Sequence, residues 1–194
     1  SLFESDEYFI DEGGAGRVFE LPVELCMKLV EDRHNNPNRE LYDLGNSAQA
    51  EMRFQEKLAN TKYSGKTRVP KVVGVLADID AKHRSAIVME RLRAINLQHI
   101  INGDAEFPPN FDLDSFFIEL EEFVEHMHSV EKVAHKDLYA RNIMVDVETG
   151  DPRIIDFGRS KSLGVELEKN KVFEDDDWKR LEEIYKALVS LQKK

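Results

Sequence analysis

The sequence predicts an α+β fold, in which a small mixed part is followed by a mainly helical part. Within residues 7–92, five short stretches have the composition of strands, and one helical stretch follows the third of them. From about residue 110, the pattern is instead that of amphipathic helices. A chain of 194 residues suits one domain or one small two-lobed unit. We therefore expect a single domain with lobes of about residues 1–92 and 93–194.

The first part holds the predicted sheet. Its five strands are expected at about residues 8–10, 18–21, 25–30, 69–76 and 85–92. The polar, Asn-rich residues 31–47 have no clear periodicity and are expected to form a loop. A helix is predicted from about Ala48 to Asn60, where Met52, Phe54 and Leu58 form an imperfect apolar stripe.

The second part is predicted to contain two longer helices. The first spans about Leu113–His128, because its apolar residues recur on one side: Phe116, Phe117, Leu120, Phe123, Val124 and Met127. Short strands are expected at residues 143–146 and 153–156, around the turn-forming sequence Glu148–Pro152. The last predicted helix runs from about Asp176 to Leu191.

The composition excludes several classes of protein. The 27 basic and 38 acidic residues give a formal net charge of −11, which argues against nucleic acid or an anionic membrane as the main partner. The single cysteine, Cys26, excludes a disulfide framework and a cysteine-based zinc site within the chain. No apolar run has the length of a membrane span, and the N-terminus lacks a signal-sequence pattern. We expect a soluble, intracellular monomer.

Two motifs stand close together in the second part. Residues His135–Asn142 read HKDLYARN, and Asp156–Gly158 reads DFG, with Asp156 standing 19 residues after Asp137. A predicted strand–turn–strand unit separates them. The pair matches the H-[RK]-D-L-x-x-x-N and D-F-G motifs, and through them the sequence resembles the protein kinase-like superfamily over about residues 8–160.

Two further segments of the first part carry the same resemblance. Asp11–Val18 (DEGGAGRV) matches the phosphate-binding pattern G-x-G-x-x-G-x-V at Gly13 and Gly16, with Asp11 in place of the first glycine. Leu25–Lys28 (LCMK) matches the V-A-I-K strand. The resemblance implies a minimal bilobal kinase-like fold, with a five-stranded N-lobe that carries one helix and a truncated helical C-lobe.

The resemblance also implies ATP and Mg²⁺ (or Mn²⁺) as cofactors and assigns roles to charged residues. Asp137 is expected to orient the attacking hydroxyl or accept its proton. Asn142 and Asp156 are expected to ligate the metal, since hard oxygen ligands suit this cation. Lys28 is expected to hold the α- and β-phosphates, oriented by a helix carboxylate. We favour Glu51 for that carboxylate, with Glu56 and Glu40 as alternatives.

The nucleotide pocket is assigned in the same way. Glycines let backbone N–H groups approach phosphates closely, so Gly13, Gly14 and Gly16 are expected at the phosphates. By resemblance, Met89 is the gatekeeper, and Glu90 and Leu92 offer backbone groups to adenine. The apolar residues expected around the purine are Val18, Cys26, Leu92, Met144 and Ile155.

The chain also departs from the family pattern. Only 36 residues follow Gly158, and they contain no A-P-E motif. Asp176 or Asp177, beside Trp178, resembles the start of the helix that anchors the catalytic loop. The sequence is therefore similar to a minimal, atypical kinase, comparable in economy with some bacterial effector kinases. One such family phosphorylates the host chaperone HSP90. This resemblance implies a protein substrate, for which a host chaperone is one candidate, and secretion into the host cytosol.

The acceptor hydroxyl is less well defined by the motifs. Ser/Thr kinases have lysine where this chain has Tyr139, and Arg141 matches the A-A-R-N of tyrosine kinases. Because most small atypical kinases phosphorylate Ser or Thr, we favour these acceptors. One alternative is a small-molecule phosphotransferase of the aminoglycoside or lipopolysaccharide kinase type, but this chain has no room for the usual helical insertion. A nucleotide-binding pseudokinase is another, but Lys28, Asp137 and Asp156 are all present.

The segment between Asp156 and the predicted helix at Asp176 is only about 20 residues long. Its two hydroxyl residues are Ser160 and Ser162, and Lys136 stands where kinases usually have a phosphate-binding arginine. A short segment has little conformational entropy to lose on ordering. The sequence therefore predicts an enzyme that needs no activating phosphorylation.

Overall fold

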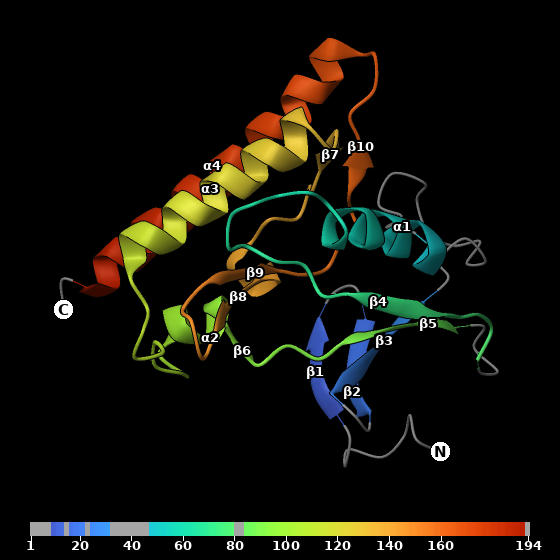
Figure 1. Ribbon diagram of the computed structural model, residues 1–194, viewed down its shortest axis with the longest axis horizontal. Coiled ribbons are helices and arrows are strands. Elements are labelled where there is room, and N and C mark those ends of the chain that lie inside the picture. Colours follow the sequence, from blue (N-terminus) through green and yellow to red (C-terminus); the bar gives the residue numbers. More distant parts are fainter. Residues whose placement is uncertain (1–8, 14–15, 22–23, 32–46, 80–83, 193–194) are drawn as a thin grey trace. The chain divides into compact units, whose positions relative to one another are not determined.

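The computed structural model describes residues 9–13, 16–21, 24–31, 47–79 and 84–192, and it confirms the α+β prediction. The chain divides into two compact units (Figure 1). The first unit comprises residues 1–59, 70–92 and 156–159, and the second comprises 60–69, 93–155 and 160–194. Among the described residues, no helix is both long enough and apolar enough to span a bilayer.

The first unit is built on an antiparallel five-stranded sheet with the strand order β1-β2-β3-β5-β4. Its strands are β1 (Phe9–Gly13), β2 (Gly16–Leu21), β3 (Leu25–Glu31), β4 (Val72–Leu76) and β5 (Arg84–Glu90). Helix α1 (Ala48–Ala59) lies against β4 and β5. The predicted order of five strands, with one helix after the third, is confirmed. Most of the predicted loop 31–47 lies outside the described residues.

Helix α1 buries a different face from the predicted one. Its buried residues recur at intervals of three and four: Ala48, Glu51, Gln55 and Leu58. The predicted stripe is wrong at Met52 and Phe54, which are only half-buried. A helix buries whichever face meets its neighbours, and here two of the four buried side chains are polar. Polar contacts, and not only apolar packing, therefore position α1 against the sheet.

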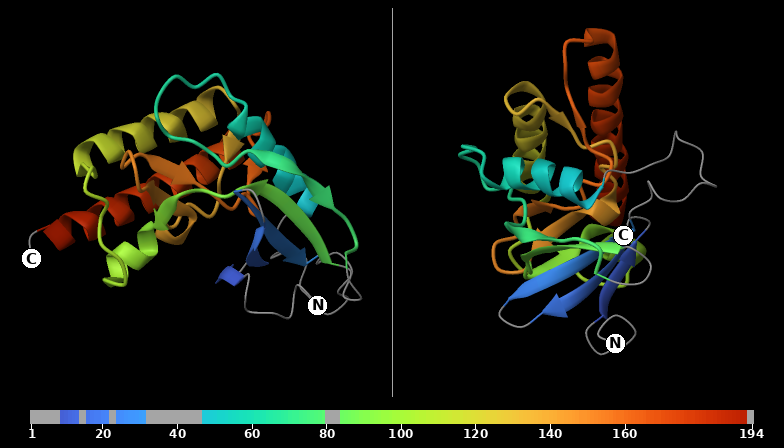
Figure 2. Two further views of the ribbon diagram at one scale, coloured as in Figure 1. Left: turned by 60° about the horizontal axis from the view of Figure 1, so that its bottom comes forward. Right: turned by 90° about the vertical axis from the view of Figure 1, so that its right-hand side faces the viewer.

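The second unit is dominated by two antiparallel helices, α3 (Leu113–Ser129) and α4 (Leu167–Gln192), which lie side by side (Figures 1 and 2). The α3 helix begins at the N-cap Asp112, whose carboxylate accepts a hydrogen bond from Ser115 N at 2.8 Å. The smaller elements are β6 (Ala94–Asn96), α2 (Leu97–Asn102), β7 (Val133–Ala134), the 3₁₀ turn η4 (Ala140–Asn142), β8 (Ile143–Asp146), β9 (Pro152–Ile154) and β10 (Lys161–Ser162). The predicted apolar face of α3 is buried, so this helix is confirmed.

Helix α4 begins at Leu167, well before the predicted start at Asp176. From Asp177 onward it has a buried face, formed by Asp177, Leu181, Ile184 and Leu188. None of the residues from Leu167 to Asp176 is buried. This stretch therefore lacks the buried apolar face whose periodicity would predict a helix from the sequence. The helix start is instead held by Asn170, whose side chain exchanges two hydrogen bonds with the backbone of Gly164.

The β8–β9 turn depends on a glycine. Gly150 has a φ of +76°, and a Cβ built on it would lie 2.6 Å from the carbonyl oxygen of Asn110. Gly103, which ends α2, has a φ of +82°, but nothing lies within 4 Å of such a Cβ. A side chain at either position would therefore be strained by the left-handed backbone, and at Gly150 it would also clash with the carbonyl group of Asn110.

We predict that Gly103→Ala lowers the free energy of unfolding by about 1–2 kcal/mol, which is the cost of a left-handed backbone for a residue with a Cβ. Gly150→Ala should cost roughly 1–3 kcal/mol more, because the new methyl group displaces backbone. Urea unfolding of the two variants measures both values. Equal losses would show that the Asn110 carbonyl yields without cost.

Candidate active site

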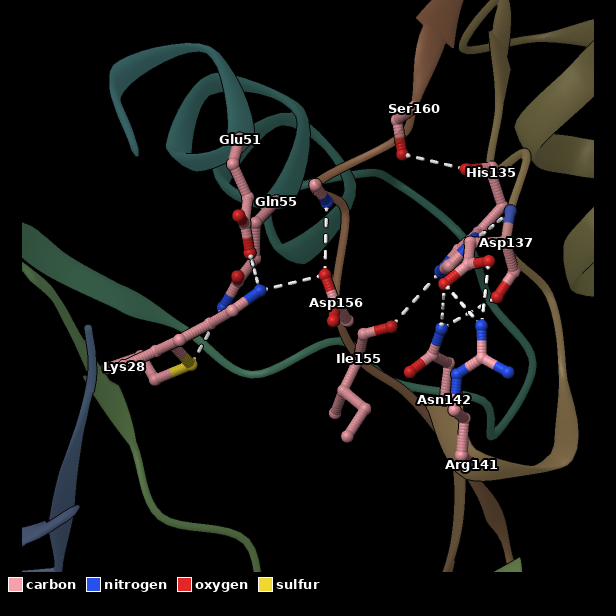
Figure 3. Close-up of polar contacts among 12 residues, drawn as sticks. Lys28, Glu51, Gln55, His135, Asp137, Arg141, Asn142, Ile155, Asp156 and Ser160 are labelled. Atoms are coloured by element: carbon pink, nitrogen blue, oxygen red, sulfur yellow. Dashed lines mark hydrogen bonds and ion pairs between the residues drawn. The ribbon is translucent and has the colours of Figure 1, made fainter. Parts of the chain in front are cut away.

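Lys28 lies at the centre of a charged cluster in the first unit (Figure 3). Its Nζ on β3 is 2.6 Å from Glu51 Oε1 on α1 and 2.7 Å from Asp156 Oδ1. The Lys28 side chain is 7% exposed and that of Glu51 is 1% exposed. Of the three glutamates considered from the sequence, Glu51 is the one that meets Lys28; Glu56 is exposed and Glu40 lies outside the described residues.

Burial and charge compete within this cluster. Burial alone would lower the pKa of Lys28, but the carboxylates of Glu51 and Asp156 outweigh it and raise the pKa. Burial raises the pKa of Glu51, Lys28 lowers it in part, and the nearby Asp156 carboxylate raises it again. Lys28 therefore stays protonated, and one buried cation serves two acidic groups.

Asp156 reaches Lys28 from a strained turn. Its φ is +64°, in the left-handed region that aspartate adopts more readily than most residues. The predicted strand 153–156 is too long, because β9 ends at Ile154. Oδ1 of Asp156 also accepts a hydrogen bond from Gly158 N at 3.1 Å. The DFG sequence thus forms a turn that holds the aspartate carboxylate toward the sheet of its own unit.

Three further predicted nucleotide residues of the first unit share one face of the sheet. Val18 stands directly opposite Lys28, and Cys26 stands directly opposite Met89, so their side chains project to the same side. Cys26, Met89 and the half-buried Val18 belong to one apolar cluster. Burial raises the pKa of the Cys26 thiol to about 11, so Cys26 is a neutral, apolar group at physiological pH.

Gln55 is a site residue that sequence reasoning missed. It lies one turn after Glu51, it is 1% exposed, and its Nε2 donates to Pro70 O at 3.0 Å and to Met89 Sδ at 3.4 Å. A buried amide requires such partners. Gln55 therefore fixes the position of α1 against β5, the strand that contains the predicted gatekeeper Met89. The sequence does carry a signal for Gln55, because it stands four residues after Glu51 and so lies on the same face of the predicted helix.

The remaining predicted nucleotide residues differ in exposure. Glu90 is exposed, and its carbonyl accepts a weak, 3.6 Å hydrogen bond from the Cys26 thiol. Leu92 is half-buried, as are Met144 and Ile155 of the second unit. Gly13 and Gly16 pair with each other at the end of the β1–β2 hairpin, and Gly14 between them lies outside the described residues.

In the second unit, the carboxylate of Asp137 is oriented by two neighbours (Figure 3). Nη2 of Arg141 donates to both of its oxygens, at 2.9 and 3.0 Å. Nδ2 of Asn142 donates to Oδ2 at 2.9 Å and to the backbone oxygen of Asp137 at 2.7 Å. Because these bonds engage the amide nitrogen of Asn142, its carbonyl oxygen is the end left to act as a metal ligand.

Asp177 holds the backbone of the loop His135–Asn142. Its buried carboxylate accepts hydrogen bonds from the backbone N of His135 and of Lys136, each at 2.8 Å, and from Nε2 of His128 at 2.9 Å. Lys136 has a φ of +65°, which is unusual for a long side chain. Of the two aspartates considered from the sequence, Asp177 anchors the loop, from the interior of α4 and not from its start.

The ring of His135 joins the loop to the strand that follows it. Its Nδ1 accepts from Asp137 N at 3.3 Å, and its Nε2 lies 3.0 Å from the carbonyl oxygen of Ile155. Since a carbonyl only accepts, these two contacts assign the neutral tautomer with the proton on Nε2. His135 therefore positions Asp137 through the backbone.

Comparison with known proteins decides the family. Residues 10–186 match the sequence model described as the protein kinase domain. The chain belongs to the protein kinase domain family. No curated protein matches it. Protein kinase domains are phosphotransferases that bind ATP and Mg²⁺. The described residues contain no cluster of three or more His, Cys, Asp or Glu side chains suited to holding a metal by themselves.

We predict that Lys28→Met destabilises this kinase domain by roughly 3–5 kcal/mol at pH 8, because it leaves the buried Glu51 carboxylate without a cation. Without Lys28 the pKa of Glu51 rises further above its unfolded value. Stability is then greatest below the unfolded pKa and falls as the pH rises through the folded pKa. The loss should therefore be smaller at pH 5 than at pH 8.

Urea unfolding of Lys28→Met, of Glu51→Gln and of the double variant at both pH values measures this coupling. The double variant should recover a large part of the loss at pH 8. Glu56→Gln, on the exposed side of the same helix, is the matched control and should change stability by less than about 0.5 kcal/mol. A loss that is equal at the two pH values would contradict the prediction.

Proposed function

We propose that this kinase domain transfers the γ-phosphate of ATP to a hydroxyl group of a protein, with serine and threonine preferred over tyrosine. The ion pair between Lys28 Nζ and Glu51 Oε1 at 2.6 Å carries the phosphotransfer part of this proposal, and the preference for serine and threonine rests on the resemblance to small atypical kinases. A degenerate, non-catalytic domain has no need to bury two charges together, because an apolar pair would cost less. Lys28, Asp137, Asn142 and Asp156 are all present as well.

The proposed reaction uses Asp137 on the acceptor. Its carboxylate orients the attacking hydroxyl and takes its proton as the hydroxyl oxygen bonds to the γ-phosphorus. The bond between the γ-phosphorus and the β–γ bridging oxygen breaks, and ADP leaves. Arg141 and Asn142 orient the Asp137 carboxylate for this role. Lys28 would bind the non-transferred phosphates, and the apolar sheet face that bears Val18, Cys26 and Met89 would contact adenine.

Each of the two proposed metal ligands offers an oxygen atom of the kind that suits Mg²⁺. Mg²⁺ is commonly bound by one or two protein oxygen groups, together with substrate phosphates and water. The Asp156 carboxylate and the Asn142 carbonyl oxygen are the two groups that we expect to bind it, and Asn142 is already oriented through its amide nitrogen. When bound, the metal would neutralise phosphate charge during transfer.

The acceptor class is best tested directly. Radiolabelled ATP would be incubated with the protein and a eukaryotic lysate, then with purified HSP90 as the chaperone candidate that the resemblance to effector kinases suggests. Phosphoamino-acid analysis should find phosphoserine or phosphothreonine. Transfer to aminoglycosides or lipopolysaccharide precursors, with no protein labelled, would favour the small-molecule alternative.

The segment after the DFG turn supports activity without prior phosphorylation. Ser160 is fully buried, and its hydroxyl donates to His135 O at 3.4 Å, so a kinase could reach it only after this segment opened. Lys136 is already engaged, with Nζ 3.0 Å from Asp176 and 4.7 Å from the ring centroid of Phe173. An incoming phosphate would have to displace these contacts.

We predict that Asp137→Asn abolishes phosphotransfer, by at least about 10²–10⁴-fold, and preserves nucleotide binding. Asp156→Ala should lose both activity and the rise in melting temperature that ATP with Mg²⁺ causes, because a ligand stabilises only the state that it binds. Thermal unfolding with and without ATP and Mg²⁺ separates the two variants. Asp151→Asn, at the β8–β9 turn, is the control. Turnover by Asp137→Asn at the wild-type rate would refute the role of Asp137.

We predict that protein verified by mass spectrometry as unphosphorylated is fully active, and that Ser160→Ala/Ser162→Ala retains most of that activity. No new arginine–phosphate contact is needed to order the segment. The measurement is the initial rate before and after treatment with phosphatase. Loss of activity on phosphatase treatment, restored by phosphorylation, would show that a switch exists.

A further inference from the structure

Arg141 needs support to keep its place on Asp137. Its side chain is 49% exposed, whereas that of Asp137 is 13% exposed. An ion pair with one exposed, flexible partner contributes only about 0–1 kcal/mol, since the long side chain loses rotamer entropy when it is held. Asn142 also donates to the Asp137 carboxylate, but the contribution of Arg141 to its orientation would be small if this ion pair were the only contact of the Arg141 guanidinium.

A tyrosine ring provides the second contact. The Cζ atom of Arg141 lies 4.3 Å from the ring centroid of Tyr139, within the range of a cation–π interaction. Tyr139 is half-buried and stands two residues after Asp137, where Ser/Thr kinases have their lysine. The ring at this position contacts the cation that reaches the catalytic carboxylate from position 141.

The same ring is contacted by a residue of α4. The Cζ atom of Arg180 lies 4.2 Å from the Tyr139 centroid, and its Nη1 donates to Glu183 at 2.8 Å. Nε of Arg180 is buried and has no hydrogen-bond partner in the described part of the chain. A buried donor without a partner is costly. This cost indicates that packing against the ring, and not optimal hydrogen bonding, determines where the Arg180 guanidinium lies.

Charge alternates along these contacts. Two guanidinium groups near one ring repel each other, and a carboxylate at each end offsets the repulsion: Asp137 at Arg141, and Glu183 at Arg180. Arg180 stands three residues after Asp177, so both lie on the same face of α4. The helix thus contacts the catalytic loop twice, at its backbone through Asp177 and at its side chains through Arg180.

We propose that Tyr139 and Arg180 are positioning residues, which hold Arg141 against Asp137 and so orient the carboxylate that receives the substrate proton. This inference rests on the proposed kinase function. Neither residue would touch ATP or the acceptor. Their loss should therefore lower kcat and leave the KM for ATP unchanged.

The test uses variants that keep bulk and remove one interaction. Arg180→Met retains most of the apolar stem and removes the guanidinium, Tyr139→Leu removes the ring, and Tyr139→Phe retains it. The two disruptive variants should each lower kcat by about tenfold, a moderate part of what a general base contributes. Tyr139→Phe should stay close to wild type. Lys186→Met, which breaks the exposed ion pair with Glu182 on the same helix, is the matched control.

Steady-state kinetics with casein, histone or myelin basic protein, whichever is labelled fastest, gives kcat and KM for ATP. Tyr139→Leu/Arg180→Met should be no slower than either single variant, because the two residues act through one contact series. Unchanged kcat in Arg180→Met would overturn the proposal. So would losses that multiply in the double variant, or a loss no greater than the fraction of unfolded protein at the assay temperature.

A readout independent of activity separates this inference from the proposed function. Ring-current shifts of the Arg141 and Arg180 side-chain protons in NMR spectra should be present in wild type, retained in Tyr139→Phe and lost in Tyr139→Leu. An inactive wild type that shows these shifts would refute the kinase function and leave the contact series intact. An active wild type without them would refute the positioning role.

Discussion

The loop His135–Asn142 depends on one buried carboxylate. Asp177 is surrounded by protein and accepts hydrogen bonds from two loop amides and from His128. A carboxylate is costly to bury unless several donors satisfy it. The loop supplies two of these donors, and α4 supplies the acceptor for the two loop amides. This contact maintains the left-handed backbone of Lys136, and it fixes the helix face that brings Arg180 to Tyr139.

The first unit also buries a charge, which here is the cation of Lys28. Lys28 is buried in a sheet whose other side chains on that face are largely apolar, so it requires carboxylates within reach. Glu51 provides one from α1, and this explains why that helix turns a polar face inward. Gln55 extends the polar face and is satisfied in turn by Pro70 and Met89. The apolar pattern usual for a buried helix face is therefore interrupted where α1 must supply a carboxylate to Lys28.

The sequence was sufficient for the features that depend on local pattern. The number of strands in the first unit, the presence of α1 and the buried face of α3 follow from the sequence pattern, whereas the order of strands in the sheet and the buried face of α1 do not. The positions of the loop and of the DFG turn follow from the spacing of Asp137, Asn142 and Asp156. The early start of α4 could not be predicted, because its first residues are exposed and carry no apolar period. The contact of Tyr139 with Arg180 could not be predicted either, because the two residues are far apart in sequence and meet only in the folded chain.

The charges of the two units bear on how a nucleotide is accepted. One cation in the first unit faces two acidic groups, and in the second unit Arg141 is matched by Asp137. The whole chain carries a net charge of −11. Lys28, the cation that we propose for phosphate binding, is therefore already matched by two carboxylates, and a bare triphosphate beside them would meet like charges, which repel it. A divalent cation that arrives with the nucleotide would offset this repulsion, and this is the physical reason for the role of Mg²⁺ ligand that we propose for Asp156.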